Sequence, residues 1–157
     1  MSRTLKVLLP LITFSTMLAA QTAPRTPLEG VWKVVVIEGT GADASTNANP
    51  QPGLVIFTAN YYSMILVPGA QSRSLFKDFR KPTNREKIRA FDSFVANTGK
   101  YEAIDSTVIF RPIVARYPNF MVDDSAEYQF RIEGNTLWLT GHVSGPKITR
   151  LRLVRVE

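Results

Sequence analysis

The sequence predicts an all-β fold, an eight-stranded antiparallel up-and-down barrel with one helix between the third and fourth strands. Apolar and polar residues alternate with a period of two in several segments that are bounded by turn signals. Long and short connections also alternate along the chain, which places the long ones at one end of such a barrel. With 157 residues, of which 45% are hydrophobic, the chain is long enough for one domain with a substantial core.

The first twenty residues have the pattern of a secretory signal. Arg3 and Lys6 precede a mostly apolar stretch, Val7–Ala20, which is too short to span a bilayer and ends in small residues. A membrane anchor is the alternative. We therefore expect export to the periplasm or beyond the cell, and three parts in the chain: a signal peptide over 1–20, a short linker over 21–27 and a barrel domain over 28–157. The chain contains no cysteine, which excludes a lipoprotein anchor, disulfides and cysteine metal sites.

The first expected strand, Leu28–Glu38, is the clearest element of the barrel. Its even-numbered residues from Leu28 to Val36, among them Trp32, share one face, whereas Glu29 and Lys33 fall on the other. Seven more strands are expected at 53–59, 61–67, 100–105, 107–114, 125–133, 136–143 and 147–156.

One helix is expected over Asn84–Asn97. Thr83 and Glu86 have the spacing of a capping box, and Gly99 follows as a stop signal. Helical spacing on one face is shown by Ile88, Phe91, Phe94 and Val95. Because this helix lies in a long connection, we expect it at the open end of the barrel, as a lid or plug. A β-sandwich or a filled barrel without a cavity is the alternative architecture.

The sequence resembles the lipocalin-like superfamily in its Gly30-Val31-Trp32 motif, its eight strands and the arginine that closes the last strand. Arg155 shares parity with Leu151 and Leu153, so it faces inward and needs a partner. The resemblance implies that Arg155 packs on Trp32 at the closed end by a cation–π contact, so that Gly30, Trp32 and Arg155 form a structural signature.

More specifically, the chain is similar to bacterial exported lipocalin-like domain proteins of uncharacterised function. The similarity lies in the blocks 52–58, 62–64, 94–102, 111–116, 118–121 and 133–140. Tyr61 stands where that group often has histidine, so any imidazole chemistry there is absent. The group has no established activity, and the resemblance therefore implies a fold more than a function.

A set of aromatic and methionine residues could line a pocket for a small hydrophobic or amphipathic ligand. The candidates are Tyr62, Met64, Phe94, Tyr101, Phe110, Tyr128 and Phe130. The alternative is that these side chains fill the barrel outright. No cofactor motif and no catalytic motif is present, so neither a cofactor nor catalytic residues are expected.

Other candidate groups have simpler explanations. His142 is the single histidine and cannot form a multi-histidine metal site. Asp123 and Asp124 could bind a cation but suit a solvated turn, and Arg111 could anchor an anion but suits exposure beside Pro112.

The segment Arg73–Arg89, called the basic segment below, holds seven basic and two acidic residues. It could meet an anionic ligand, a membrane surface or an acidic partner, although a solvated surface explains it as well. No nucleic-acid motif is present, so nucleic acid is not expected as a partner.

Three functions remain from the sequence. The favoured one is an exported protein that binds a small hydrophobic or amphipathic molecule in a barrel. The second is a partner-binding or structural envelope protein acting through the basic segment. The third is a lyase or isomerase that uses tyrosine, arginine or carboxylate groups in the same barrel.

Overall fold

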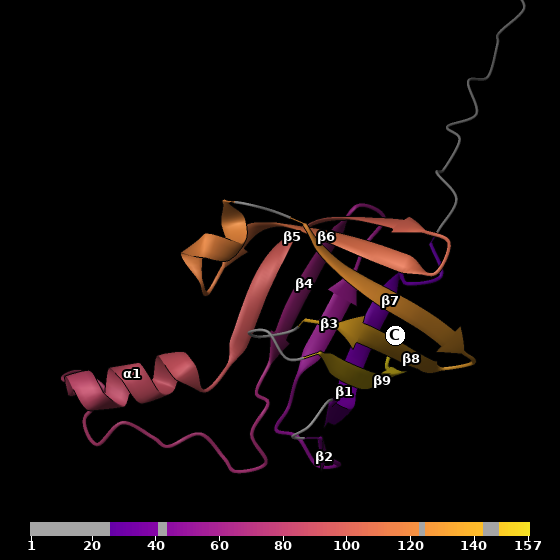
Figure 1. The fold of residues 1–157 in the computed structure, drawn as a ribbon. Coiled ribbons are helices and arrows are strands. Elements are labelled where there is room, and N and C mark those ends of the chain that lie inside the picture. Colours follow the sequence, from indigo (N-terminus) through magenta and orange to yellow (C-terminus); the bar gives the residue numbers. More distant parts are fainter. Residues whose placement is uncertain (1–25, 41–43, 123–124, 143–147) are drawn as a thin grey trace, which may run out of the picture.

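A computed structural model of the protein describes residues 26–40, 44–122, 125–142 and 148–157, so the expected signal peptide lies outside the described residues. The described strands form one antiparallel sheet in the order β2-β1-β3-β4-β5-β6-β7-β8-β9, and β1 also pairs with β9 (Figure 1). The strands are β1 (Gly30–Gly39), β2 (Ser45–Asn47), β3 (Leu54–Phe57), β4 (Tyr61–Leu66), β5 (Val95–Ile104), β6 (Thr107–Ala115), β7 (Ala126–Glu133), β8 (Thr136–Gly141) and β9 (Thr149–Arg155). The helices are α1 (Asn84–Asp92) and the 3-10 helix η1 (Pro118–Met121).

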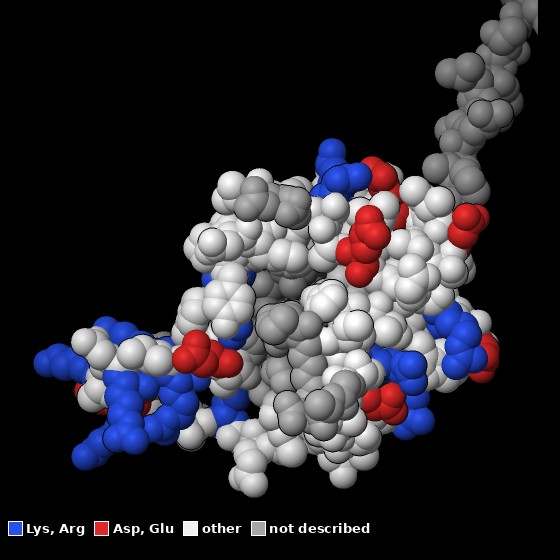
Figure 2. All heavy atoms as spheres, in the orientation of Figure 1, with Lys and Arg blue, Asp and Glu red and all other residues white. Residues whose placement is uncertain are grey.

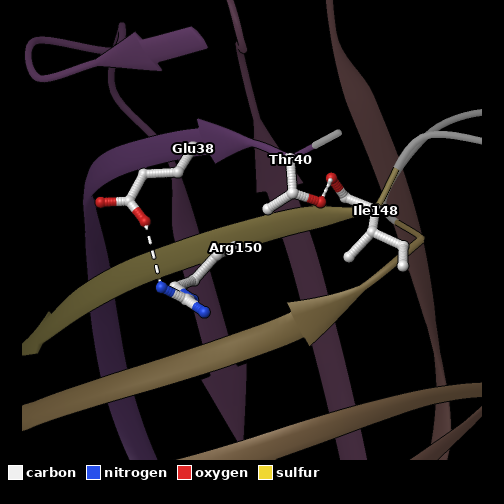
Figure 3. Close-up of polar contacts among 4 residues, drawn as sticks. All are labelled: Glu38, Thr40, Ile148 and Arg150. Atoms are coloured by element: carbon white, nitrogen blue, oxygen red, sulfur yellow. Dashed lines mark hydrogen bonds and ion pairs between the residues drawn. The ribbon is translucent and has the colours of Figure 1, made fainter. Parts of the chain in front are cut away.

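The β1–β9 pairing closes the sheet, and the prediction of a closed eight-stranded antiparallel barrel is confirmed. The two strands meet from Trp32↔Arg155 to Gly39↔Thr149. Polar contacts stabilise the β1–β9 pairing near Gly39 and Thr149. Thr40 Oγ1 donates to the Ile148 carbonyl (3.1 Å), and the Arg150 guanidinium lies 3.6 Å from the Glu38 carboxylate (Figure 3).

The predicted place of the helix is wrong, because α1 follows the fourth strand and not the third. The additional strand is β2, which pairs with the last three residues of β1 at Ile37↔Asn47 to Gly39↔Ser45. A three-residue strand is too short to show an alternating pattern, and its surroundings are rich in Gly, Asn and Pro. Sequence patterning therefore could not separate it from a loop.

The predicted end of the helix is also wrong. α1 ends at Asp92, and Val95–Gly99 forms the first half of β5, paired with β4 from Leu66↔Val95 to Tyr62↔Gly99. Two periods compete here: Phe91, Phe94 and Val95 fit a helix, but residues 95, 97, 99 and 101 are all buried, as in a strand. Pairing with β4 and burial in the barrel outweigh local helix propensity.

Gly99 has a packing role and does not stop the helix. A Cβ at this position would collide with the backbone of β6 at Arg111, Pro112 and Ile113. The register between β5 and β6 shifts at Thr98/Gly99, so the glycine permits the two backbones to approach at a bulge.

α1 is not a plug in the barrel. None of its residues is buried, and it extends beside the barrel from the connection between β4 and β5 (Figure 1). Its capping box is present: Glu86 Oε2 accepts from the Thr83 amide (2.8 Å), and Thr83 Oγ1 accepts from the Glu86 amide (3.3 Å).

The barrel has two different ends. Tight turns at 58–60, 105–106 and 134–135 lie at the end where Trp32 and Arg155 meet, called the closed end. The longer connections, which join β1 to β3, β4 to β5, β6 to β7 and β8 to β9, leave and re-enter the sheet at the opposite end, called the mouth. This arrangement follows from the antiparallel order of the strands, and it places the helix-bearing connection at the mouth.

Candidate functional site

The closed end is fastened by Trp32 and Arg155. The Trp32 side chain is fully buried, its Nε1 donates to the Leu28 carbonyl (2.7 Å), and the Arg155 guanidinium lies 4.1 Å from its ring centroid. Arg155 also donates to the carbonyls of Pro27 (2.9 Å) and Glu29. These contacts join the first and last strands to the segment before β1, so they hold the fold together.

Gly30 is required beside this pair. Its φ is +130°, a conformation that L side chains rarely adopt, and a Cβ would collide with the Glu157 carbonyl and the Arg155 guanidinium. The motif Gly30-x-Trp32 is therefore explained by packing at the closed end.

Four of the predicted ligand residues contact one another or Phe57 inside the barrel. Tyr62 stacks on Phe110 with centroids 4.2 Å apart, Phe110 lies 5.0 Å from Tyr128, and Phe57 lies 5.1 Å from Tyr101. This aromatic cluster consists of Phe57, Tyr62, Tyr101, Phe110 and Tyr128. Its mutual contacts show that this part of the interior is packed.

The other predicted ligand residues lie in different places. Met64 is fully buried and lies opposite Asn97 in the β4–β5 register, nearer the mouth. Phe130 is partly buried and packs against the core. Phe94 is separate from this set: it lies outside the barrel wall, where Arg73 and Arg116 approach its ring at 5.0 and 5.6 Å.

Two buried polar atoms of the interior have no hydrogen-bond partner in the described part of the chain: the Tyr62 hydroxyl and Asn97 Oδ1. By contrast, the Tyr128 hydroxyl donates to the His142 carbonyl (2.9 Å), and the Tyr101 hydroxyl donates to the Thr58 carbonyl (2.8 Å). A buried polar atom without a partner costs free energy, so these two atoms stand out as places where a ligand group could bond.

The tyrosine hydroxyls of the interior stay protonated over the whole physiological range. Burial raises the pKa of Tyr62, and the neighbouring Tyr128 raises it further. Burial likewise raises the pKa of Tyr128 and, less strongly, of Tyr101. A hydroxyl with a raised pKa is a neutral donor and acceptor and a poor base.

The mouth half of the interior is lined by Val36, Met64, Leu66, Val95 and Asn97. Asn97 is the only polar or charged residue of the described chain that is buried, with 8% of its surface exposed. The sequence interpretation missed it because position 97 was assigned to the helix. The alternation of buried residues at 95, 97, 99 and 101 is the signal that could have identified it.

The remaining sequence candidates lie on the surface. Arg111 is exposed and lies 3.5 Å from Glu102, so it points away from the interior. His142 is exposed, and Asp123 and Asp124 lie outside the described residues. In the described ranges, no cluster of three or more His, Cys, Asp or Glu residues could hold a metal ion.

A shallow groove lies on the outside of the barrel beside α1. It has a volume of about 350 Å³ and is lined by Ser63, Ile65, Phe94, Ala96, Asn97, Thr98, Val114, Ala115 and Arg116. Arg116 donates to the Phe91 carbonyl (2.6 Å) and lies 3.9 Å from the Tyr117 ring, so it connects α1 to the barrel. Ile65 and Val114 are more than half exposed in this groove.

Within the described residues, α1 and η1 are both too short or too polar to cross a bilayer as a helix.

Comparison with known families agrees with the barrel fold. The chain matches the lipocalin-like domain over residues 29–150, which is most of its length and runs from β1 through β8 to the first two residues of β9. The protein is therefore a lipocalin-like barrel protein. It belongs to the lipocalin-like domain family, as its resemblance to such proteins implied. A search of curated proteins found no significant match.

Proposed function

We propose that the protein is exported and binds a small, uncharged amphipathic molecule in the mouth half of its barrel. The observation that supports this most is the pair of unpartnered polar atoms, the Tyr62 hydroxyl and Asn97 Oδ1, in an otherwise apolar interior. Both atoms would gain a hydrogen bond from a ligand that carries a hydroxyl or amide group on an apolar body.

The polarity of the interior favours a neutral ligand. The buried residues of the described chain include no Lys, Arg, Asp or Glu, and Tyr62 and Tyr128 keep their protons at neutral pH. An ionised carboxylate inside would lose its hydration without gaining a countercharge. An alcohol or amide would lose much less hydration and would meet the same two polar atoms.

A lyase or isomerase function has less support. It needs a charged or perturbed group that can move a proton at the substrate. Arg155, which packs on the buried Trp32 ring, is already engaged at the closed end by that ring and by the carbonyls of Pro27 and Glu29.

Calorimetric titration with decan-1-ol and decanoate at pH 8 tests the proposed function, because the two probes share a chain length and differ in charge. We expect decanol to bind more tightly. Tyr62→Phe should weaken decanol binding about fivefold, the equivalent of one hydrogen bond of about 1 kcal/mol. Ser63→Ala, the outward neighbour on β4, is the matched control and should bind as the wild type does.

Three results would contradict the proposal: binding of neither probe, tighter binding of decanoate, or equal effects of the Tyr62 and Ser63 substitutions. The export part has its own test. N-terminal mass determination of the protein from the periplasm or medium should find a chain that begins near Gln21, and an intact Met1 in the cytoplasm would refute export.

A further inference from the structure

The connection between β4 and β5 carries an unusual combination of exposed apolar and basic side chains. Leu75 is 93% exposed, Phe79 84% and Ile88 62%, and Phe91 is 43% exposed. Large apolar side chains that are so exposed, and that lie within a short segment, indicate a surface that contacts another molecule and not a small hydrophobic cluster of the protein itself.

The rest of the protein covers the apolar side of α1 only in part: the Phe91 ring lies 5.7 Å from the Tyr117 ring and 5.2 Å from the Arg116 guanidinium. Ile88 and Phe91, three residues apart, share one side of the helix and are exposed. Glu86 and Ala90, four residues apart, share another side and are less exposed. In a helix packed on its own domain the apolar side is buried, whereas Ile88 on this side of α1 is left exposed.

Basic side chains surround these apolar residues. The basic segment holds seven basic and two acidic residues, a net charge of +5. Figure 2 shows Lys and Arg side chains gathered over α1 and the connection beside it, with few of either sign over the neighbouring barrel surface.

The carboxylates of the two acidic residues of the segment accept hydrogen bonds from backbone amides. Glu86 accepts from the amides of Lys77 (2.8 Å) and Thr83 (2.8 Å), and Asp78 Oδ1 accepts from the Arg80 amide (2.9 Å). Arg73 is likewise occupied, since it donates to Ser93 Oγ and the Ala90 carbonyl. Six exposed basic residues form no ion pair within the described chain: Lys77, Arg80, Lys81, Arg85, Lys87 and Arg89.

We propose that residues 73–91 bind the surface of an anionic lipid bilayer, with Leu75, Phe79 and Ile88 inserted at the level of the headgroups. Exposed apolar side chains ringed by cations are the chemistry of an interfacial amphipathic element. An acidic protein would attract the same charges, but it would not require three large, separately exposed apolar side chains. Because the segment emerges at the mouth, the bilayer would lie on the mouth side of the barrel.

Vesicle flotation of the full chain tests the proposal, with vesicles of phosphatidylcholine alone and of phosphatidylcholine mixed with phosphatidylglycerol. We expect binding to the anionic vesicles that weakens at high salt. Each basic residue near an anionic surface contributes about 1 kcal/mol, which is about fivefold in affinity. The triple variant Arg80→Gln, Lys81→Gln, Arg85→Gln should therefore bind roughly 100-fold more weakly.

A matched control removes the same charge elsewhere. Lys33→Gln, Lys100→Gln, Arg152→Gln replaces three exposed basic residues of the barrel wall and should leave binding within about twofold of wild type, since these lie outside the contact. All variants and the wild type share residues 1–20, so any vesicle binding by that apolar stretch is constant. The double variant Leu75→Ser, Phe79→Ser should fold normally, because both side chains are exposed, and should lose binding at low and high salt alike.

Several outcomes would overturn the proposal. Equal binding to both kinds of vesicle would show that charge does not drive binding. Equal losses of vesicle affinity in the two triple variants would show that binding does not depend on this segment. Full binding by the Leu75/Phe79 variant would exclude insertion. Binding to poly-glutamate without binding to anionic vesicles would assign the segment to an acidic protein partner instead of a lipid surface.

Discussion

Replacing Trp32 tests the closed end of the barrel most severely. Trp32 is fully buried, donates to the Leu28 carbonyl and lies beneath the Arg155 guanidinium. Truncating a buried tryptophan to alanine costs about 3–5 kcal/mol through lost burial and the cavity that remains. The lost hydrogen bond adds about 1 kcal/mol. Trp32→Ala should therefore lower the free energy of unfolding by about 5 kcal/mol, a large part of the total for a domain of this size.

Arg155 adds a smaller, separable contribution. Its guanidinium keeps the Pro27 and Glu29 carbonyls as acceptors when the indole is removed, so it does not become an unpaired buried charge. A double-mutant cycle with Trp32→Phe and Arg155→Met should therefore give a coupling energy of only about 1 kcal/mol.

Trp138 is a matched control, because it is half-buried on the outer face and carries Arg131 4.0 Å from its ring. Urea denaturation followed by far-ultraviolet circular dichroism measures each variant. We expect Trp138→Ala to cost about 1–2 kcal/mol, well below Trp32→Ala. A cost under about 1 kcal/mol for Trp32→Ala, or equal costs for the two tryptophans, would refute the assignment of Trp32 to a buried, closed end.

Three further predictions concern pH and packing. The raised pKa values of Tyr62, Tyr128 and Tyr101 mean that the unfolded chain loses protons first, so stability should fall as pH rises above about 10, by up to about 1.4 kcal/mol per pH unit for each tyrosine. Alkaline urea titrations should show a smaller slope in Tyr62→Phe than in the wild type, and an unchanged slope would contradict this prediction. Gly99→Ala should destabilise the barrel by more than about 2 kcal/mol because its Cβ would collide with the β6 backbone. Gly69→Ala should be neutral in the same thermal melts, because a Cβ there would make only an ordinary van der Waals contact with the Gln71 carbonyl. Equal melting temperatures would refute the close approach at Gly99. Hydrogen bonds from Lys77 and Thr83 lower the pKa of Glu86 to about 2. The cap of α1 should therefore be intact above about pH 4.5 and be lost as pH falls toward 2. Amide exchange in α1 that is insensitive to pH over this range would count against the capping box.

The sequence predicted the barrel well because the alternation of apolar and polar residues within each long strand shows which side chains are buried. β7 alternates cleanly, and the tight turn at Gly134–Asn135 connects it to β8, with Glu133 paired to Thr136. The inward parity of Arg155 and the position of Trp32 were likewise readable from residue spacing. These features depend only on residues i and i+2 of a strand sharing one face, and this spacing can be seen in a single sequence.

Features that depend on distant partners could not be predicted in this way. Val95–Gly99 fits a helical period, and only its pairing with β4 makes it a strand. The same error hid Asn97 and placed Phe94 inside the barrel, although it lies outside beside Arg116. The exposure of Leu75 and Phe79 is equally invisible in the sequence, because it reflects how the described helices and strands pack and not the local pattern.

The proposed ligand site can be tested most directly with two adjacent residues that point to opposite faces of β4. Met64 is fully buried, and Ile65 is 54% exposed in the outer groove. Methyl NMR spectra recorded during titration with decan-1-ol should show saturable shifts and intermolecular contacts at the Met64 methyl group, with little change at Ile65. Contacts at Ile65 and Val114 with an unchanged Met64 signal would place the ligand outside the barrel and contradict an interior site.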